Sequence, residues 1–255
     1  MGDWSTEITD SARKKKFIRF RDLILLETED VILVNKPRGF VSIPDRWDKE
    51  GTSLFGMGQK YFPDLMVCHR LDKMTTGLMV FAKNPDAHRD ISIQFQDREI
   101  VKHYSALAMG VKDIKDYVVD APINVVQGGK VKIDNLNGKP ATTVFDTAEL
   151  FEEHTLFDCQ PLTGRTHQVR IHLSVLGSPI VGDTEYGGKD VYLSHLKYNY
   201  KPNRRGEERP LNDGYLLHAA GLYLRLPGEE ESRNFIAPLP EHFEVVLRML
   251  RKFAS

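Results

Sequence analysis

The sequence predicts an α+β fold in which a mixed, mostly antiparallel β-sheet is flanked by a few helices. Short apolar runs recur between turn-forming residues along the 255-residue chain, as is typical of strands. Few segments show helical periodicity. The dipeptide Asn137-Gly138 favours the tight turns that join antiparallel strands. A strand-rich pattern with few helices and such a turn favours the α+β class.

Composition places the chain among globular proteins. Hydrophobic residues make up 41% of it, enough for one large domain or two small ones. No run of about 18 apolar residues occurs and the N-terminus lacks a signal-peptide pattern, so we expect no membrane span and no leader. Cys68 and Cys159 lie in apolar runs, which indicates buried thiols in a cytoplasmic protein. The net charge of −1 argues against a general polycation, so RNA binding would require local basic patches.

Residues 1–20 are a polar, basic N-terminal arm. Its basic cluster comprises Arg13, Lys14, Lys15, Lys16, Arg19 and, just beyond it, Arg21. Two interpretations remain open, a frayed tail with solvated charges and an arm that contacts RNA phosphates. We expect residues 21–255 to form the main domain.

The first part of this domain is expected to be rich in strands. Residues 24–26 and 31–34 are strand-like. Pro37 and Gly39 then predict a tight turn, because proline lacks a backbone donor and glycine permits positive φ. The glycine-containing segment 42–60 is interpreted as a loop.

Two apolar runs, residues 64–68 and 78–82, predict buried strands on either side of a polar loop. A helix should follow, because Asn84 suits an N-cap and Pro85 suits the first helical position. Apolar residues recur at helical spacing as far as Asp97, which gives this helix one buried face.

The second part of the domain combines strands, two helices and an insert. The predicted strands are residues 100–109, 130–134, 142–150, 155–161 and 216–226. Thr166 is expected to cap a helix that ends before Gly177, and Pro240 to open a terminal helix with one apolar face. Residues 189–214 form a polar insert in which tyrosines alternate with basic residues. It is either a surface loop or a contact for single-stranded RNA.

The polar loop between the two apolar runs carries the candidate chemistry. It presents the carboxylate of Asp72 beside His69 and Arg70, followed by the hydroxyls of Thr75 and Thr76. Catalytic groups commonly lie on loops that rigid strands position. An alternative is that Arg70 and Asp72 form a surface ion pair that only shapes a turn.

At this loop the sequence resembles the RluA-type pseudouridine synthases. Residues 69–77 read H-R-L-D-K-M-T-T-G, with Thr76 where the usual family motif has serine. The other motifs follow in the family order. They are Lys36-Pro37-Arg38-Gly39, Lys102-His103-Tyr104, Thr163-Gly164-Arg165-Thr166-His167-Gln168-Val169-Arg170-Ile171-His172-Leu173, Gly182-Asp183-x-x-Tyr186-Gly187 and Leu217-His218-Ala219. The resemblance covers roughly residues 30–240, without the S4 RNA-binding domain of some relatives.

The resemblance implies a fold and a set of site residues. The family fold has two half-domains that share one bent sheet, with an active cleft between them. Asp72 matches the family's catalytic aspartate, Arg165 the arginine that pairs with it, and Tyr104 the tyrosine that packs against the flipped base. Arg70, His69 and Leu217 are expected at the substrate-binding surface. A lone tyrosine in a strand is otherwise more often a core residue.

The implied function is isomerisation of specific uridines in structured rRNA or tRNA to pseudouridine. This reaction conserves atoms, so we expect no cofactor. His167 and His172 are five residues apart, which does not suit a two-histidine metal pair, so we expect no metal. RNA is the expected partner of a monomeric enzyme. Alternatives are an inactive RNA-binding protein of the same fold and a glycosidase-like hydrolase, which would require two carboxylates.

Overall fold

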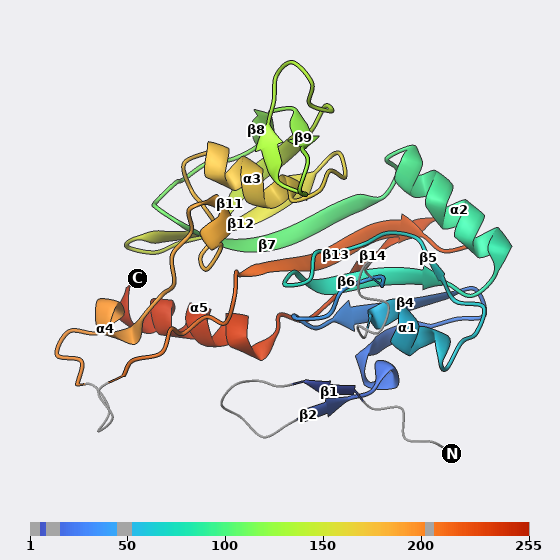
Figure 1. The fold of residues 1–255 in the computed structure, drawn as a ribbon, viewed down its shortest axis with the longest axis horizontal. Helices are drawn as coiled ribbons and strands as arrows, with labels where there is room; N and C mark the ends of the chain where they lie inside the picture. The colour runs from blue at the N-terminus through green and yellow to red at the C-terminus, as the bar shows by residue number, and fades with distance from the viewer. Residues whose placement is uncertain (1–5, 9–15, 45–52, 202–206, 255) are drawn as a thin grey trace. The chain divides into compact units, whose positions relative to one another are not determined.

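The computed structural model describes residues 6–8, 16–44, 53–201 and 207–254, and it confirms a mixed α+β fold with a mostly antiparallel sheet (Figure 1). The chain divides into two compact units. Unit 1 comprises residues 1–100 and 221–238, and unit 2 comprises residues 101–220 and 239–255.

The elements of unit 1 are β1 (Thr6–Ile8), β2 (Lys16–Ile18), η1 (Phe20–Leu23), β3 (Ile24–Glu27), β4 (Val31–Lys36), α1 (Leu54–Gln59), β5 (Met66–Val67), β6 (Thr76–Ala82), α2 (Pro85–Gln96) and β14 (Ser232–Ile236). Those of unit 2 are β7 (Val101–Met109), β8 (Tyr117–Asp120), β9 (Ile123–Val125), β10 (Val131–Ile133), β11 (Thr142–Leu150), β12 (His154–Pro161), α3 (Gln168–Val175), η2 (Thr184–Tyr186), α4 (Leu193–Leu196) and α5 (Glu241–Phe253). Strand β13 (Leu217–Arg225) begins in unit 2 and ends in unit 1.

Unit 1 is organised around β6, whose seven residues are all buried. Strand β4 pairs antiparallel with β6 from Val31 to Lys36, and β3 pairs with β4 on its other side. Because β6 is covered on both faces, it reads as a continuous apolar run. Helix α2 packs its predicted apolar face, including Ala87 and Ile91, into the core cluster formed with β4 and β6 (Figure 1). Its N-cap is Asn84, as expected, whose side chain accepts from the Ala87 N–H.

Unit 2 is built on a run of antiparallel strands in the order β7, β12, β11 and β8. The predicted strands at 142–150 and 155–161 are confirmed, and they pair antiparallel with Thr143 opposite Pro161 and Leu150 opposite Thr155. The predicted terminal helix is also confirmed as α5. Its apolar stripe is fully buried in a second core cluster of this unit. Burial of one face, rather than helix propensity, supplies most of the stability of such a helix.

Several sequence predictions were wrong in detail. Part of the expected loop at 42–60 is helix α1, which begins after Ser53, whose hydroxyl accepts from Gly56 N–H at 2.9 Å. Thr166 is not the N-cap of α3, because the helix starts at Gln168 and the cap is His167. Strand β10 pairs with β9, and the short strands β8, β9 and β14 were missed. These strands span only three to five residues, too few for a clear alternation of burial.

The insert at 189–214 is anchored at both ends within unit 2. Val191 is 3% exposed and Asn212 is 2% exposed. The Val191 N–H donates to Asn212 Oδ1 at 2.8 Å, and Leu211 N–H donates to the Val191 carbonyl at 2.7 Å. The interpretation of the whole segment as a surface loop is therefore incomplete. Arg204 and Arg205 of the insert, like Arg13, Lys14 and Lys15 of the N-terminal arm, lie outside the described residues.

In the part of the chain that the structure describes, no helix is both long enough and apolar enough to cross a membrane.

Candidate active site

The loop that carries Asp72 connects β5 to β6 in unit 1. Asp72 is half-buried, whereas Arg70 is exposed and the intervening Leu71 is buried. The loop closes on itself through a hydrogen bond from the Thr75 N–H to the Asp72 carbonyl at 3.2 Å. The apolar runs on either side therefore place a short polar segment directly before the first residue of the fully buried strand β6, as the sequence predicted.

A buried ammonium group lies beneath this loop. Lys36, at the end of β4, is 0% exposed. Its Nζ atom donates to the carbonyls of Lys73 at 3.0 Å and Thr75 at 2.7 Å, and to that of Pro37 at 3.2 Å. Burial lowers the pKa of Lys36 to about 7, while the charge of Asp72 acts in the opposite direction. The three carbonyls match the three donors of a charged lysine.

His69 ties the start of the loop to its scaffold. Its Nε2 atom accepts from the Val80 N–H of β6 at 3.0 Å, so the imidazole continues the hydrogen bonding of the strand edge after β5 ends at Val67. The ring also packs against Phe95 of α2, with ring centroids 4.7 Å apart. The structure thus brings His69, Arg70 and Asp72 together on one loop and turns His69 toward the protein interior.

In unit 2, Arg165 lies on a turn that one buried side chain holds. Gln168, 4% exposed, accepts at Oε1 from the Arg165 N–H at 3.0 Å and from the Thr163 hydroxyl at 2.7 Å. Its Nε2 atom donates to the Thr142 carbonyl at 2.9 Å and to the Thr143 hydroxyl at 3.0 Å. All four hydrogen-bonding positions of the amide are used. The backbone of the Arg165 turn is thereby fixed to β11.

The same turn is linked to the strand that carries Tyr104. Lys102, two residues before Tyr104 on β7, donates from Nζ to the carbonyl of Thr163 at 2.9 Å, two residues before Arg165. Tyr104 is half-buried and stands opposite Cys159 in the ladder between β7 and β12. The guanidinium of Arg165 donates from Nε to the Pro140 carbonyl at 3.0 Å. A single lysine therefore links the strand that carries Tyr104 to the turn that carries Arg165 within unit 2.

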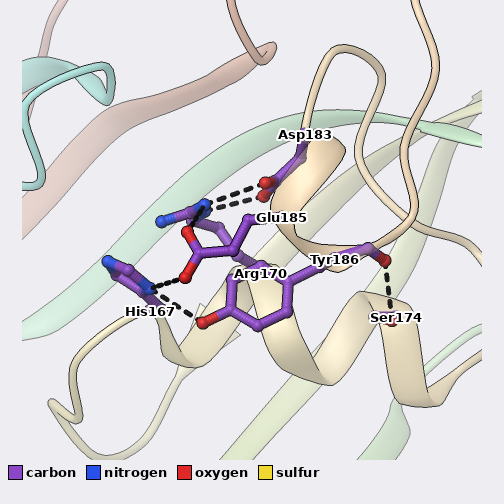
Figure 2. A network of polar contacts seen from close by, with 6 residues as sticks. All are labelled: His167, Arg170, Ser174, Asp183, Glu185 and Tyr186. Atoms are coloured by element: carbon purple, nitrogen blue, oxygen red, sulfur yellow. Dashed lines mark hydrogen bonds and ion pairs between the residues drawn. The ribbon is translucent and has the colours of Figure 1, made fainter. Parts of the chain in front are cut away.

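Helix α3 is anchored by Arg170, which forms a charge cluster with the buried Asp183 and the exposed Glu185 (Figure 2). The Arg170 side chain is 5% exposed. Its Nε and Nη2 atoms donate to both carboxylate oxygens of Asp183 at 2.7 and 2.8 Å, and Nη2 also donates to Glu185 at 2.7 Å. The guanidinium carbon Cζ also lies over the rings of Tyr186 and Tyr215, 4.9 and 4.5 Å from their centroids. These contacts raise the pKa of Arg170, against the effect of burial.

The cluster continues to the N-cap of the helix, His167. His167 adopts a left-handed conformation with φ of 56°, which costs roughly 1–3 kcal/mol for a residue other than glycine. Its Nδ1 atom is 2.8 Å from the hydroxyl of Tyr186 and 3.7 Å from Glu185 (Figure 2). Ser174, one residue before the helix end, donates to the Tyr186 carbonyl at 2.9 Å. Both ends of α3 are thus tied to the segment 183–186.

Four residues that organise these sites lie in the sequence motifs but had no predicted role: Lys36, Gln168, Arg170 and Asp183. For Arg170 and Asp183 the sequence does indicate an ion pair, because arginine and aspartate in adjacent motifs commonly bind each other. Nothing local predicts a fully buried lysine, since lysine is rarely found inside. Leu217, expected at the substrate surface, is 4% exposed at the start of β13.

The described side chains offer carboxylate and cationic chemistry. Within residues 6–8, 16–44, 53–201 and 207–254, no group of three or more His, Cys, Asp or Glu side chains is arranged to hold a metal ion. Neither cysteine suits a nucleophile, because burial raises the pKa of Cys68 to about 12 and that of Cys159 well above its usual value. Asp72, on a loop anchored by a buried ammonium, is the best-placed candidate for covalent or acid–base work.

Comparisons with known proteins agree with this chemistry. A family model described as RNA pseudouridylate synthase matches residues 30–175. Ribosomal large subunit pseudouridine synthase D of Vibrio parahaemolyticus is 37% identical over 237 residues, which cover 90% of this chain and 70% of the relative. A Bacillus subtilis relative described as uncharacterized RNA pseudouridine synthase YlyB is 34% identical over 244 residues, covering 90% of this chain and 73% of the relative. Ribosomal large subunit pseudouridine synthase C of Vibrio parahaemolyticus is 32% identical over 251 residues, covering 96% and 75%.

Solved structures give the same fold. Human RNA pseudouridylate synthase domain containing 4 superposes with a TM-score of 0.69 at 28% identity, covering 91% of this chain and 95% of the human one. Human RNA pseudouridylate synthase domain containing 1 gives a TM-score of 0.63 at 26% identity, covering 89% and 94%.

Proposed function

The chain belongs to the RNA pseudouridylate synthase family, and from that membership we propose that it isomerises specific uridines of ribosomal RNA to pseudouridine. As a member of this family it is an isomerase that acts on RNA. We choose ribosomal RNA as the substrate because the relatives that match this chain are named for the large ribosomal subunit. The matches cover nine tenths of this chain or more. Transfer RNA is the competing substrate.

Asp72 is the carboxylate that we assign to the reaction. The bond between N1 and C1′ of uridine breaks, the base turns, a bond forms between C5 and C1′, and the proton on C5 is lost while N1 gains one. A carboxylate beside the sugar can bond to C1′ or remove a 2′ proton. Both routes need an ionised aspartate, and the ammonium of Lys36 is close enough for the two charges to interact.

Arg165 is proposed to pair with Asp72 during the reaction. Its backbone is fixed by Gln168, and its side chain is partly exposed. A pair of opposite charges about 4 Å apart attracts by roughly 4 kcal/mol at an effective dielectric constant near 20. This attraction would favour the ionised carboxylate that either route requires.

The substrate is tested by mapping pseudouridine in total RNA from cells with and without this protein. The expected result is loss of pseudouridine at one or a few positions of large-subunit ribosomal RNA, restored by the wild-type chain. Loss confined to transfer RNA would contradict the ribosomal substrate and keep the activity. If no position changes and the purified chain binds RNA without turnover, the inactive RNA-binding alternative would replace the proposal.

Tyr104 is proposed as the platform for the flipped uracil ring. Leaving the stack costs the base a few kcal/mol, and stacking on an aromatic ring recovers about 1–3 kcal/mol. Tyr104→Phe should retain most of the activity, whereas Tyr104→Ala should lower kcat/KM by roughly 5- to 150-fold. Steady-state kinetics on a short ribosomal RNA fragment would show this. Equal kcat/KM for the alanine variant and the wild type would remove Tyr104 from this role.

Arg70 is proposed to contact an RNA phosphate, because it is exposed on the loop that carries Asp72. Neutralising one phosphate contact lowers the slope of log binding constant against log salt concentration by about one. Arg70→Gln should therefore bind RNA with a smaller salt dependence than the wild type. An unchanged slope in a filter-binding titration would show that Arg70 does not contact phosphate.

We assign Leu217 to the apolar wall of the site, which Leu217→Ala would test through a rise in KM.

We further propose that the protein acts as a monomer in the cytoplasm. Its mass by sedimentation at micromolar concentration, and its distribution on cell fractionation, would test these two statements.

A further inference from the structure

We propose that Ser42 is a positioning residue for Asp72, an inference that rests on the proposed role of Asp72 in catalysis. The Ser42 hydroxyl accepts a hydrogen bond from the Leu71 N–H at 3.0 Å and donates one to the Leu71 carbonyl at 2.7 Å. Ser42 is 3% exposed and lies 29 residues away in sequence. Ser42 lies in none of the sequence motifs described above.

The position of Leu71 explains why one hydroxyl matters. Leu71 is 6% exposed, and it lies between β5, which ends at Val67, and β6, which begins at Thr76. It therefore belongs to neither strand, so a ladder does not satisfy its backbone groups. Buried N–H and C=O groups require partners, and Ser42 supplies both. The Leu71 carbonyl belongs to the peptide unit that leads into Asp72, so its hydrogen bond fixes the orientation of that unit.

The residues after Asp72 are held from the same segment of chain. Lys36 Nζ donates to the carbonyls of Lys73 and Thr75, and the Gly39 N–H donates to the Lys73 carbonyl at 2.9 Å. Gly39 has φ of 82°, which glycine adopts without strain. Ser42 and Lys36 thus hold Asp72 from its two sides in sequence, and the turn at Pro37–Gly39 joins the two holding residues.

Ser42 is itself fixed by the start of α1. The Phe55 N–H donates to the Ser42 carbonyl at 3.1 Å, and the Leu54 N–H donates to the Val41 carbonyl at 2.9 Å. The Ser42 hydroxyl also lies 3.5 Å from the sulfur of Met79 in the buried strand β6. Because the Ser42 side chain is held on two sides, its own position is fixed. The loop that it binds is therefore fixed as well. A catalytic group displaced by about 1 Å can lose roughly 100-fold in rate.

The test compares Ser42→Ala, which removes the hydroxyl, with Ser42→Thr, which retains it. Ser42→Ala should lower kcat at least about 10-fold per folded molecule, with the dissociation constant for RNA changed less than about 2-fold. Ser42→Thr should recover most of kcat. The folded fraction of each variant is measured by thermal melting, so that loss of fold is separated from loss of rate.

Thr155→Val is the matched control. The Thr155 hydroxyl of unit 2 is buried, with the residue 0% exposed, and like that of Ser42 it accepts from a backbone N–H, that of Lys112 at 3.0 Å, and donates to a backbone carbonyl, that of Gly110 at 2.8 Å. Its removal should lower the melting temperature without lowering kcat per folded molecule. If Ser42→Ala turns over as fast as the wild type, or if Thr155→Val loses kcat to the same extent, Ser42 has no positioning role.

The variant Asp72→Asn separates this inference from the proposed function. If Asp72→Asn is inactive while Ser42→Ala has normal kcat, the positioning role of Ser42 is wrong and the role of Asp72 stands. If Asp72→Asn remains active, the assignment of Asp72 fails, and the inference about Ser42 fails with it. Should Ser42→Thr fold poorly because of its extra methyl group, Ser42→Cys, with a weak donor of similar size, should give a kcat between those of serine and alanine.

Discussion

Replacing Asp72 by asparagine is expected to abolish pseudouridine formation, with a loss of at least about 10³-fold in single-turnover rate. The amide has nearly the same size as the carboxylate, so the loop held by Lys36 and Ser42 should keep its shape. An amide can neither carry the negative charge nor take a proton at neutral pH. Conversion of a uridine-containing ribosomal RNA fragment, followed by nucleoside analysis, would measure the rate, and filter binding would show that affinity for RNA survives.

A matched control is available in the same unit. Asp86 is an exposed carboxylate in the first turn of α2, and Asp86→Asn makes the same chemical change away from the loop. It should leave the rate within about 2-fold of the wild type. Arg165→Met should lower the rate less than Asp72→Asn, because it removes the proposed partner and leaves the carboxylate. Normal turnover by Asp72→Asn would exclude the carboxylate from the chemistry altogether.

The largest loss of stability is expected from Arg170→Met. This change leaves the carboxylate of Asp183, which is 1% exposed, buried without its partner. Removing one member of a buried ion pair costs about 3–5 kcal/mol of unfolding free energy. The loss of the contacts with Tyr186 and Tyr215 adds to this effect. Urea unfolding followed by circular dichroism would measure it.

Arg251→Met provides the comparison for a surface pair. Arg251 forms a similarly bidentate pair with Glu149, in which Nη2 lies 2.7 Å from Oε2, but the Arg251 side chain is 53% exposed. Exposed pairs contribute only about 0–1 kcal/mol. Arg170→Lys should lose an intermediate amount, since lysine keeps the charge without the fork of donors. Similar losses at positions 170 and 251 would show that burial of the Arg170 cluster does not determine its contribution.

Elements with a repeated local pattern were accurately predicted from the sequence. These elements are the helices α2 and α5, the cap at Asn84 and the strands β11 and β12. Each is specified by residues that lie close together in the sequence. The loop of Asp72 was located by the apolar runs that flank it. The short helix α1 and the start of α3 were missed, because neither depends on a repeated pattern. At the latter, a left-handed His167 replaces an ordinary cap.

The class of fold, the order of most elements and the residues whose types suit the chemistry follow from local patterns in the amino-acid sequence. How those residues are held depends on contacts between distant parts of the chain. The hydroxyl of Ser42 meets Leu71 across 29 residues, and the ammonium of Lys36 meets Thr75 across 39. Such contacts leave no periodic trace, because a hydrogen bond depends on the positions of two atoms and not on their separation along the chain. A buried lysine is stable only where carbonyl groups from distant residues converge on it.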